Sequence, residues 1–324
     1  MKAIVQDRYG SPDVLELREI GRPVAGDHEV LVRVRAAAVN ARDWHLMRGD
    51  PYLARLVLGF GGPKAKVRGT DFAGVVEAVG KDVTRLRPGD EVFGEAEGAF
   101  AEYVCAPADV VEAMPAGLSF EQAAALPLAG NTALMGLRDL GRVRPGQKVL
   151  VNGASGGVGT FAVQIAKALG AEVTGVCGTR NVELVRSLGA DHVVDYSRED
   201  FTRGGPHHDL VLDLVGNRSP AACRRALTPG GTLVLSGGGV SDGGSLLGPM
   251  ALLMKGQALS PFVGQRLVVL TATPSGANLA ALRELVEPGK VTPVIDRTYP
   301  LHEVPEAIRY LEVEHARAKV VITV

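Results

Sequence analysis

Near its centre the chain reads Lys148-Val-Leu-Val-Asn-Gly153-Ala-Ser-Gly156-Gly-Val-Gly159-Thr-Phe-Ala-Val-Gln-Ile-Ala-Lys167. An apolar run typical of a buried strand leads directly into a cluster of glycines. The glycines lead directly into a segment whose apolar residues recur at helical spacing, and Gly170 then provides a C-terminal stop. The stretch therefore predicts a strand, a tight turn and a helix in immediate succession.

Each glycine of this turn has a physical role. Gly153 lets the chain leave the strand sharply, Gly156 lets backbone N–H groups approach a pyrophosphate, and Gly159 lets the helix pack closely on the strand. The helix N-terminus adds partial positive charge. A tight loop without a ligand is the alternative interpretation. We expect dinucleotide binding by the whole turn, although the first fingerprint glycine is replaced by Ala154: Gly153, Ala154, Ser155, Gly156, Gly157, Val158 and Gly159.

Strands and helices alternate from Lys148 onward. The predicted strands are 149–151, 172–177, 193–196, 210–215 and 232–236. Such alternation indicates a parallel sheet with helices on both faces. A last strand, Leu267–Ala272, is expected at the edge of this sheet, where it would pair across a two-fold axis to make a homodimer.

The rest of the chain predicts a second domain. The first third contains many short Val-rich segments separated by turn residues, which suggests a partly open β-barrel. Ser119 and Gln122 form a predicted capping box that opens a helical region. The last residues do not continue the strand–helix alternation. We therefore predict an α/β protein with a β-rich domain over 1–122 and 276–324, and a doubly wound parallel-sheet domain over 123–275.

Composition excludes several classes of protein. A formal charge of −1 in 324 residues argues against nucleic-acid binding, because no excess of basic residues exists to contact phosphates. The three cysteines, Cys105, Cys177 and Cys223, form no CxxC pair, so neither a disulfide framework nor a cysteine-rich zinc lobe fits. No apolar run has the length of a signal peptide or a membrane span, so we expect a cytoplasmic protein.

The residues after the second strand of the parallel sheet indicate which dinucleotide binds. An NAD site would place an acidic residue there, but the chain reads Gly178-Thr179-Arg180-Asn181, and Glu183 already lies in the next helix. Thr179 and Arg180 suit a 2′-phosphate, because a guanidinium binds phosphate in bidentate fashion. The alternative is that Arg180 is a solvated residue at a helix start. The sequence therefore favours NADPH.

These motifs together resemble the zinc-independent quinone oxidoreductase (zeta-crystallin-like) group of the medium-chain dehydrogenase/reductase superfamily. The resemblance extends over nearly the whole chain and is carried by 40–43, 69–80, 88–94, 98–104, 146–167, 289–296 and the strand at Lys319. It implies a GroES-like catalytic domain and a Rossmann cofactor domain. In the zinc enzymes of the superfamily a Cys and a Gly-His-Glu supply ligands, whereas the matching places here hold Asn40 and Gly69-Thr70-Asp71. No zinc is expected.

The resemblance also implies roles for individual residues. Asn40 would lie beside the nicotinamide, with Asp43 following it, although turn and capping roles are the alternative. Thr132 would lie against the nicotinamide, or bond to its own helix turn; Tyr196 would lie near the 2′-phosphate, or be a half-buried aromatic. Gly237 and Gly238 would lie over the nicotinamide, and Asn217 would be a turn residue or a site residue. Tyr52, Trp44 and His45 would line the acceptor pocket, although a structural role is favoured for His45. We predict Asn40 and Tyr52 as catalytic residues.

Three functions follow from this pattern. Without a metal to lower an alcohol pKa, reduction of an activated acceptor is favoured, and the predicted function is hydride transfer from NADPH to a quinone, enone or enal. An enoyl-thioester reductase is the second hypothesis, in which the basic run Lys64, Lys66 and Arg68 would hold a phosphate-bearing carrier. The third is an NADPH-binding structural or regulatory protein with little turnover.

Overall fold

The computed structural model describes residues 1–236, 246–248, 250–314 and 316–324, and the chain divides into two compact units. Unit 1 comprises Met1–Asn131, Thr273–Pro288 and Pro293–Val324, and unit 2 comprises Thr132–Ala272 and Gly289–Thr292. The sequence predicts the domain boundaries at 122/123 and 275/276. The predicted site residues Gly237 and Gly238 lie outside the described residues. Among the helices that are described, none combines the length and the apolar character that crossing a membrane requires.

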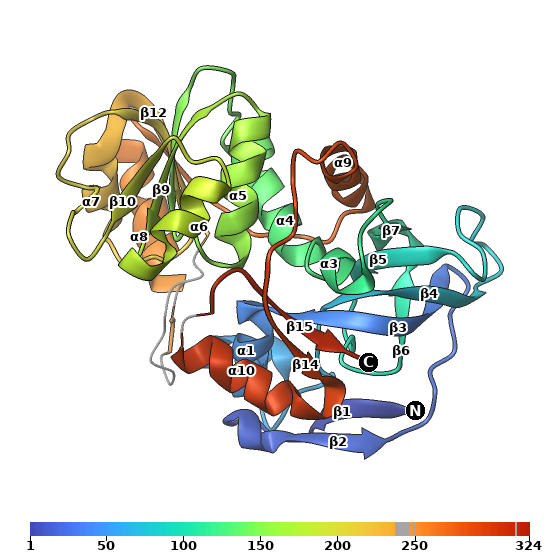
Figure 1. Cartoon of the computed structure of the whole chain (residues 1–324). Coiled ribbons are helices and arrows are strands. Elements are labelled where there is room, and N and C mark those ends of the chain that lie inside the picture. The colour runs from blue at the N-terminus through green and yellow to red at the C-terminus, as the bar shows by residue number, and fades with distance from the viewer. Residues whose placement is uncertain (237–245, 249, 315) are drawn as a thin grey trace. The chain divides into compact units, whose positions relative to one another are not determined.

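Unit 2 is an alternation of strands and helices (Figure 1). Its strands are β8 (Lys148–Asn152), β9 (Glu172–Cys177), β10 (His192–Asp195), β11 (His208–Asp213), β12 (Leu227–Leu235) and β13 (Arg266–Val269). Its helices are η4 (a π-helix, Met135–Leu140), α5 (Gly157–Ala168), η5 (Thr179–Asn181), α6 (Val182–Ser187), α7 (Pro220–Cys223), η6 (Arg224–Ala226), α8 (Met250–Leu259) and η7 (Ser260–Phe262). Helix α4 (Pro127–Leu134) crosses from unit 1 into unit 2.

The six strands of unit 2 form one parallel sheet in the order β10-β9-β8-β11-β12-β13. This is the doubly wound order in which the chain first moves to one edge and then returns past β8 to the other. The apolar residues of β8 are fully buried, as expected for a parallel strand covered on both faces. The predicted α/β fold with a Rossmann sheet is confirmed, and β13 forms one edge of that sheet.

Unit 1 is mainly β. Its strands are β1 (Lys2–Gln6), β2 (Leu15–Glu19), β3 (Glu29–Val39), β4 (Asp71–Val79), β5 (Glu91–Glu95), β6 (Tyr103–Pro107), β7 (Val111–Ala113), β14 (Ile295–Pro300) and β15 (Lys319–Thr323). Its helices are η1 (Pro12–Val14), α1 (Ala41–Arg48), η2 (Tyr52–Ala54), α2 (Arg55–Leu58), η3 (Ala108–Val110), α3 (Phe120–Ala124), α9 (Gly276–Val286), η8 (Leu301–Glu303) and α10 (Val304–Val313). Helices α1 and α10 lie side by side (Figure 1).

A seven-stranded sheet organises unit 1. The strand order is β14-β15-β3-β4-β5-β7, with β6 also paired to β3, and β1 and β2 form a separate antiparallel pair. The predicted capping box is confirmed, because the Ser119 hydroxyl accepts from the Gln122 N–H at 3.3 Å and the Gln122 side-chain carbonyl accepts from the Ser119 N–H at 3.1 Å, so that α3 begins at Phe120. Strand β15 lies between β14 and β3 in this sheet, so residues far apart in the sequence are neighbours there.

A buried lysine joins β15 to its neighbours. The Lys319 side chain is 2% exposed, and its Nζ donates to Asn40 Oδ1 at 2.6 Å and lies 3.5 Å from Asp71 Oδ2. Asp71 is the first residue of β4, and Asn40 directly follows β3. A charge this deep is tolerated only when it is paired and hydrogen-bonded, so the cluster specifies which strand ends meet.

We expect Lys319→Met to destabilise the protein by about 3–5 kcal/mol, because the buried Asp71 carboxylate loses its counter-charge. The matched control is Lys81→Met, which breaks a pair whose Lys81 and Asp27 side chains are 70% and 60% exposed. That exposed pair is expected to contribute less than about 1 kcal/mol. Urea unfolding measures both changes. Equal losses in the two variants would contradict the prediction.

Candidate functional site

The glycine turn of unit 2 adopts the geometry predicted for it. Gly153 has φ +90°, a left-handed conformation that favours glycine, and the N–H groups of Gly153 and Ala154 both donate to Val176 O, at 3.1 and 3.0 Å. A Cβ on Gly159 would lie 2.0 Å from Gly153 O. The absence of a side chain at Gly159 is therefore what lets α5 begin so close to the end of β8.

Gly156 differs from Gly159 in what surrounds it. It is the N-cap of α5, its φ is an ordinary −82°, and a Cβ built on it would meet only Gly153 O, at 3.4 Å. Packing within the chain thus leaves room at Gly156, and that room is where an anion would meet the first N–H groups of α5. The Ser155 hydroxyl accepts from Asn181 Nδ2 at 3.0 Å, which ties the turn to η5. The turn fits a pyrophosphate.

The residues predicted to distinguish the dinucleotides lie together where β9 and β10 end. These strands are parallel neighbours, and Asp195 at the end of β10 is in register with Cys177 at the end of β9. Thr179 and Arg180 follow in η5. The Tyr196 hydroxyl lies 2.9 Å from the position that a Cβ on Gly178 would occupy, and the Tyr196 residue is 57% exposed.

One acidic residue at this place was not expected from the sequence. Asp195 accepts from the Thr179 hydroxyl at 2.6 Å and from the Ser197 hydroxyl at 2.7 Å. These hydrogen bonds, from Thr179 first and Ser197 second, lower the pKa of the Asp195 carboxyl. The residues that directly follow β9 include no acid, and this one comes from the neighbouring strand β10.

In unit 1 the predicted catalytic residue Asn40 is 6% exposed and takes part in the Lys319 cluster. Its Nδ2 donates to Asp71 Oδ2 at 3.0 Å and to Ala38 O at 3.3 Å, while its Oδ1 accepts from Lys319. Both amide hydrogens are therefore used inside unit 1. Lys319 was not singled out from the sequence, although a lysine at the head of an apolar strand is a signal that it is paired.

The Asp43 carboxylate has a capping role in the structure. It accepts from the Asn40 N–H at 2.8 Å at the start of α1, and from the Thr70 hydroxyl at 3.0 Å. Burial raises the pKa of the Asp43 carboxyl to about 6, and the Asn40 N–H partly opposes that rise. Burial also raises the pKa of Asp71, against the opposing effect of Lys319. Asp43 thus orients the chain between β3 and α1.

A third carboxyl completes this polar interior. Glu95, at the end of β5, is 4% exposed and accepts from Asn131 Nδ2 at 3.3 Å. Burial, followed by the nearby charge of Asp71, raises the pKa of Glu95 to about 7. The Asn131 side-chain carbonyl in turn accepts from Asn278 Nδ2 at 2.8 Å, which connects α9 to the cluster. Of the three buried carboxyl groups, Asp71 is the one that the Lys319 ammonium contacts, at 3.5 Å.

The places that correspond to zinc ligands by resemblance have another chemistry here. Asn40 and Asp71 face the Lys319 ammonium, and Thr70 donates to Asp43. A cation at Asn40 and Asp71 would be repelled by that ammonium. Across the described ranges, no group of three His, Cys, Asp or Glu side chains is arranged to hold a metal ion.

The other predicted pocket residues lie on α1, which Asn40 caps, and on the following η2. Tyr52 begins η2, is 45% exposed, and has the Arg55 guanidinium 4.5 Å from its ring centroid. His45 packs edge-on against Trp44 with ring centroids 4.3 Å apart, and its Nδ1 lies 3.2 Å from Asp50 O. Burial lowers the pKa of His45, which agrees with a structural role for this residue.

The remaining predicted residues are distributed over both units. Thr132 lies in α4 and is 5% exposed. The Asn217 side-chain carbonyl accepts from Asn152 Nδ2 at 3.0 Å, at the end of β8. In the basic run Arg68 is 6% exposed and donates to Ala65 O, while Lys66 lies 3.8 Å from Asp7. Lys64 and Lys66 are therefore exposed, whereas Arg68 is withdrawn into unit 1.

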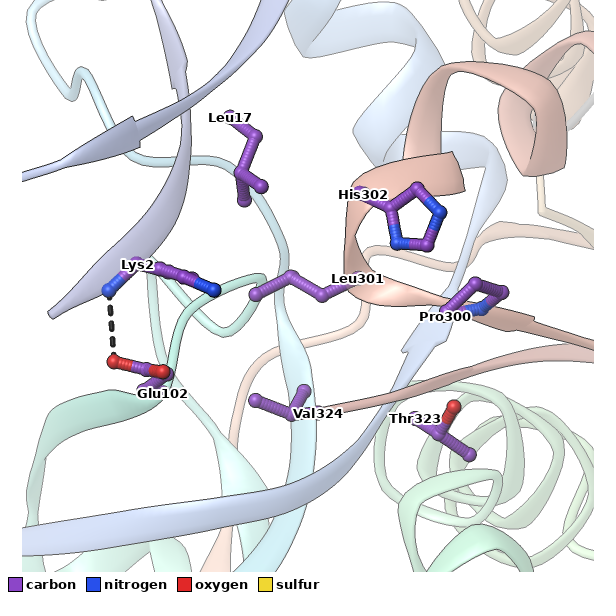
Figure 2. A pocket seen from close by; sticks show the side chains of 8 residues that line it. All are labelled: Lys2, Leu17, Glu102, Pro300, Leu301, His302, Thr323 and Val324. Atoms are coloured by element: carbon purple, nitrogen blue, oxygen red, sulfur yellow. Dashed lines mark hydrogen bonds between the residues drawn. The ribbon is translucent and has the colours of Figure 1, made fainter.

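A hollow of about 350 Å³ on unit 1 is lined by other residues. Figure 2 shows the Lys2 N–H donating to Glu102, at 2.8 Å, beside the Leu301 and Leu17 side chains. Its lining residues are Lys2, Leu17, Glu102, Pro300, Leu301, His302, Thr323 and Val324. None of these belongs to the predicted site, and we assign no role to the hollow.

The carboxyl cluster makes stability depend on pH. Glu95 has a pKa of about 7 when folded, whereas an unfolded Glu side chain has about 4.3. Between these values the folded chain binds more protons, so its free energy of unfolding falls as pH rises. We expect Glu95→Gln to reduce that slope by up to about 1.4 kcal/mol per pH unit.

Urea unfolding from about pH 5 to about pH 8 measures this slope. Glu91→Gln is the control, since Glu91 is an exposed residue of the same strand β5. An unchanged slope in Glu95→Gln would show that this carboxyl does not carry the pH dependence.

Comparison with known proteins agrees with this architecture. Residues 26–116 match the family described as alcohol dehydrogenase GroES-like domain, and residues 188–322 match that described as zinc-binding dehydrogenase. The solved structure of Escherichia coli quinone oxidoreductase complexed with NADPH superposes with a TM-score of 0.85 at 26% identity and covers 100% of both chains.

Two relatives extend the comparison in sequence. Mouse (Mus musculus) mitochondrial NAD(P)H oxidoreductase RTN4IP1 is 36% identical over 100% of this chain and 89% of the relative. The chloroplastic NADPH-dependent alkenal/one oxidoreductase of Arabidopsis thaliana is 34% identical over 99% of this chain and 79% of the relative. The chain therefore belongs to the quinone oxidoreductase (zeta-crystallin-like) group of the medium-chain dehydrogenase/reductase superfamily.

Proposed function

We propose that this chain is an NADPH-dependent reductase that transfers hydride, without zinc, to a quinone or to an α,β-unsaturated carbonyl. The observation that carries the proposal is the turn from Gly153 to Gly159, which directly follows a central strand of the Rossmann sheet and leaves Gly156 open to an anion. The names of the relatives, which are quinone and alkenal/one oxidoreductases, support the acceptor class. A similar fold complexed with NADPH supports the cofactor.

In this proposal the protein binds and orients the reactants. NADPH supplies the hydride from its nicotinamide ring. The first N–H groups of α5 hold the pyrophosphate, and Arg180 holds the 2′-phosphate beside Tyr196 and Thr179. The nicotinamide end is assigned, as a proposal, to Asn40, Thr132, Gly237 and Gly238.

The acceptor needs little help from the protein. Negative charge spreads over a conjugated system as hydride arrives, so one hydrogen bond to the acceptor oxygen stabilises it, and a proton from a nearby donor or from solvent completes the reduction. Both Asn40 amide hydrogens are already donated to Asp71 and Ala38, so we assign donation to the acceptor oxygen to the Tyr52 hydroxyl and a positioning role to Asn40. The absence of zinc, a cytoplasmic location and a homodimer paired through β13 belong to the same proposal.

The two alternatives have less support. An enoyl-thioester reductase would use the basic run to hold a phosphate-bearing carrier. Lys64 and Lys66 are exposed there, but Arg68 is buried and Lys66 lies 3.8 Å from Asp7. An NADPH-binding protein with little turnover is distinguished by experiment: it would bind NADPH in stoichiometric amount and oxidise it with no quinone, enal or enoyl thioester.

We expect Gly156→Ala to fold normally but to bind NADPH at least about tenfold more weakly, because a methyl group there meets only Gly153 O at contact distance and occupies the room left for the phosphates. Gly159→Ala is the contrasting variant. Its Cβ would lie 2.0 Å from Gly153 O, so it should lower the thermal midpoint as well. Fluorescence titration and thermal melting test both. Undiminished binding in Gly156→Ala would rule out this assignment.

An acceptor panel tests the function as a whole. Loss of NADPH absorbance should be fast with quinones, enones or enals, and slower with enoyl thioesters. Arg180→Ala should raise KM for NADPH about tenfold and leave KM for NADH unchanged, since one charge-assisted contact to the 2′-phosphate is lost. Arg186→Ala is the control, because Arg186 pairs with Glu183 at 2.7 Å on the exposed side of α6. If Arg180→Ala changed neither KM, the 2′-phosphate assignment would fail.

A further inference from the structure

The carboxylate of Asp195 lies at the place where the two dinucleotides differ. Asp195 ends β10 in register with Cys177, which ends β9, and the Tyr196 N–H donates to Cys177 O at 3.0 Å. The residue after Cys177 is Gly178, and Tyr196 lies over its backbone. In a doubly wound sheet the adenosine ribose is bound at the end of the second strand, which here is β9.

Asp195 engages the hydroxyl hydrogens of its two neighbours. Three oxygen–oxygen contacts join the group: Thr179 to Asp195 at 2.6 Å, Ser197 to Asp195 at 2.7 Å, and Thr179 to Ser197 at 3.0 Å. Thr179 and Ser197 possess one hydroxyl hydrogen each. Both hydrogens are donated to Asp195, so neither remains to donate to a phosphate.

The charge of Asp195 acts in the same direction. Its side chain is one-tenth exposed, and it accepts the Ser197 N–H at 3.0 Å in addition to the two hydroxyls. Arg198 forms an ion pair with this carboxylate, with its Nε 3.5 Å from Asp195 Oδ2. A doubly charged 2′-phosphate would therefore meet an anion and occupied hydroxyl donors, with the Arg198 side chain, which is 74% exposed, as the counter-charge of that anion. A ribose 2′-hydroxyl could instead donate its hydrogen to the lone pairs of the Thr179 and Ser197 hydroxyl oxygens, whose own hydrogens Asp195 accepts.

We propose that Asp195 is a specificity-determining residue that limits the preference for NADPH, so that the protein also accepts NADH. This inference rests on the proposed dinucleotide function and adds to it the residue that restrains the discrimination. Arg180 favours the phosphate, while Asp195, acting through Thr179, Ser197 and Arg198, favours the free ribose.

The test is the ratio of two dissociation constants in the full-length protein. NADPH and NADH are each titrated against the wild type and Asp195→Asn by nucleotide fluorescence, without an acceptor. This isosteric change removes the charge and replaces one accepting oxygen by an amide nitrogen, so that one hydroxyl hydrogen and Arg198 are released. The preference for NADPH should rise about tenfold, the effect of one charge-assisted contact.

Two further variants make the result specific. Glu199→Gln removes an exposed carboxylate four residues along the same segment and should leave the ratio within about twofold of the wild type. Ser197→Ala removes a hydrogen bond that compensates the Asp195 charge, so it should shift the ratio in the opposite direction, toward NADH. Thermal melting confirms that each variant is folded.

The outcomes separate the two proposals. An unchanged or lowered preference for NADPH in folded Asp195→Asn overturns the role of Asp195 while the dinucleotide function stands. Equal weakening of both nucleotides also overturns it, because a purely structural residue would act on both alike. If the wild type bound neither nucleotide, the proposed function itself would fall, and the role of Asp195 with it.

Discussion

The ammonium group of Lys319 lies in the interior of unit 1, and its charge has to be matched there. It faces Asn40 after β3 and Asp71 at the start of β4, so three strand ends are joined at one point. Burying a charge costs several kcal/mol of desolvation free energy unless an ion pair and hydrogen bonds offset that cost. This requirement makes the meeting of these strand ends specific. The loop into α1 and the contacts of Glu95 and Asn131 extend outward from the same cluster.

The same residues occupy the place that corresponds to the zinc site of related enzymes, and the proposed reaction uses no metal. A catalytic zinc site brings positive charge to a place lined by polar and acidic side chains. In this chain a lysine from the last strand supplies positive charge to the matching place, at Asn40 and Asp71. Because a lysine cannot polarise a carbonyl as zinc does, the proposed reaction is restricted to acceptors that delocalise their own charge.

Unit 2 is organised around a different constraint, the close approach of backbone to backbone at Gly159. That approach places the start of α5 against the end of β8 and leaves Gly156 open, which suits an anion. The end of β9, by contrast, has an anion beside it in Asp195. The proposed pyrophosphate site and the proposed ribose site thus belong to two separate, neighbouring turns.

The parallel sheet, the glycine turn and the capping box at Ser119 could all be predicted from the sequence, because periodicity, glycine stereochemistry and capping are local properties. The roles of Asn40, Asp195 and Lys319 could not. Lys319 and Asn40 are 279 positions apart, and the hydrogens of Thr179 and Ser197 are assigned only once β9 and β10 lie side by side. The sequence alone determined the order of strands and helices and the glycine turn. The tertiary structure decided which charges are paired and which hydrogen-bond donors are still available, because both depend on contacts between distant segments.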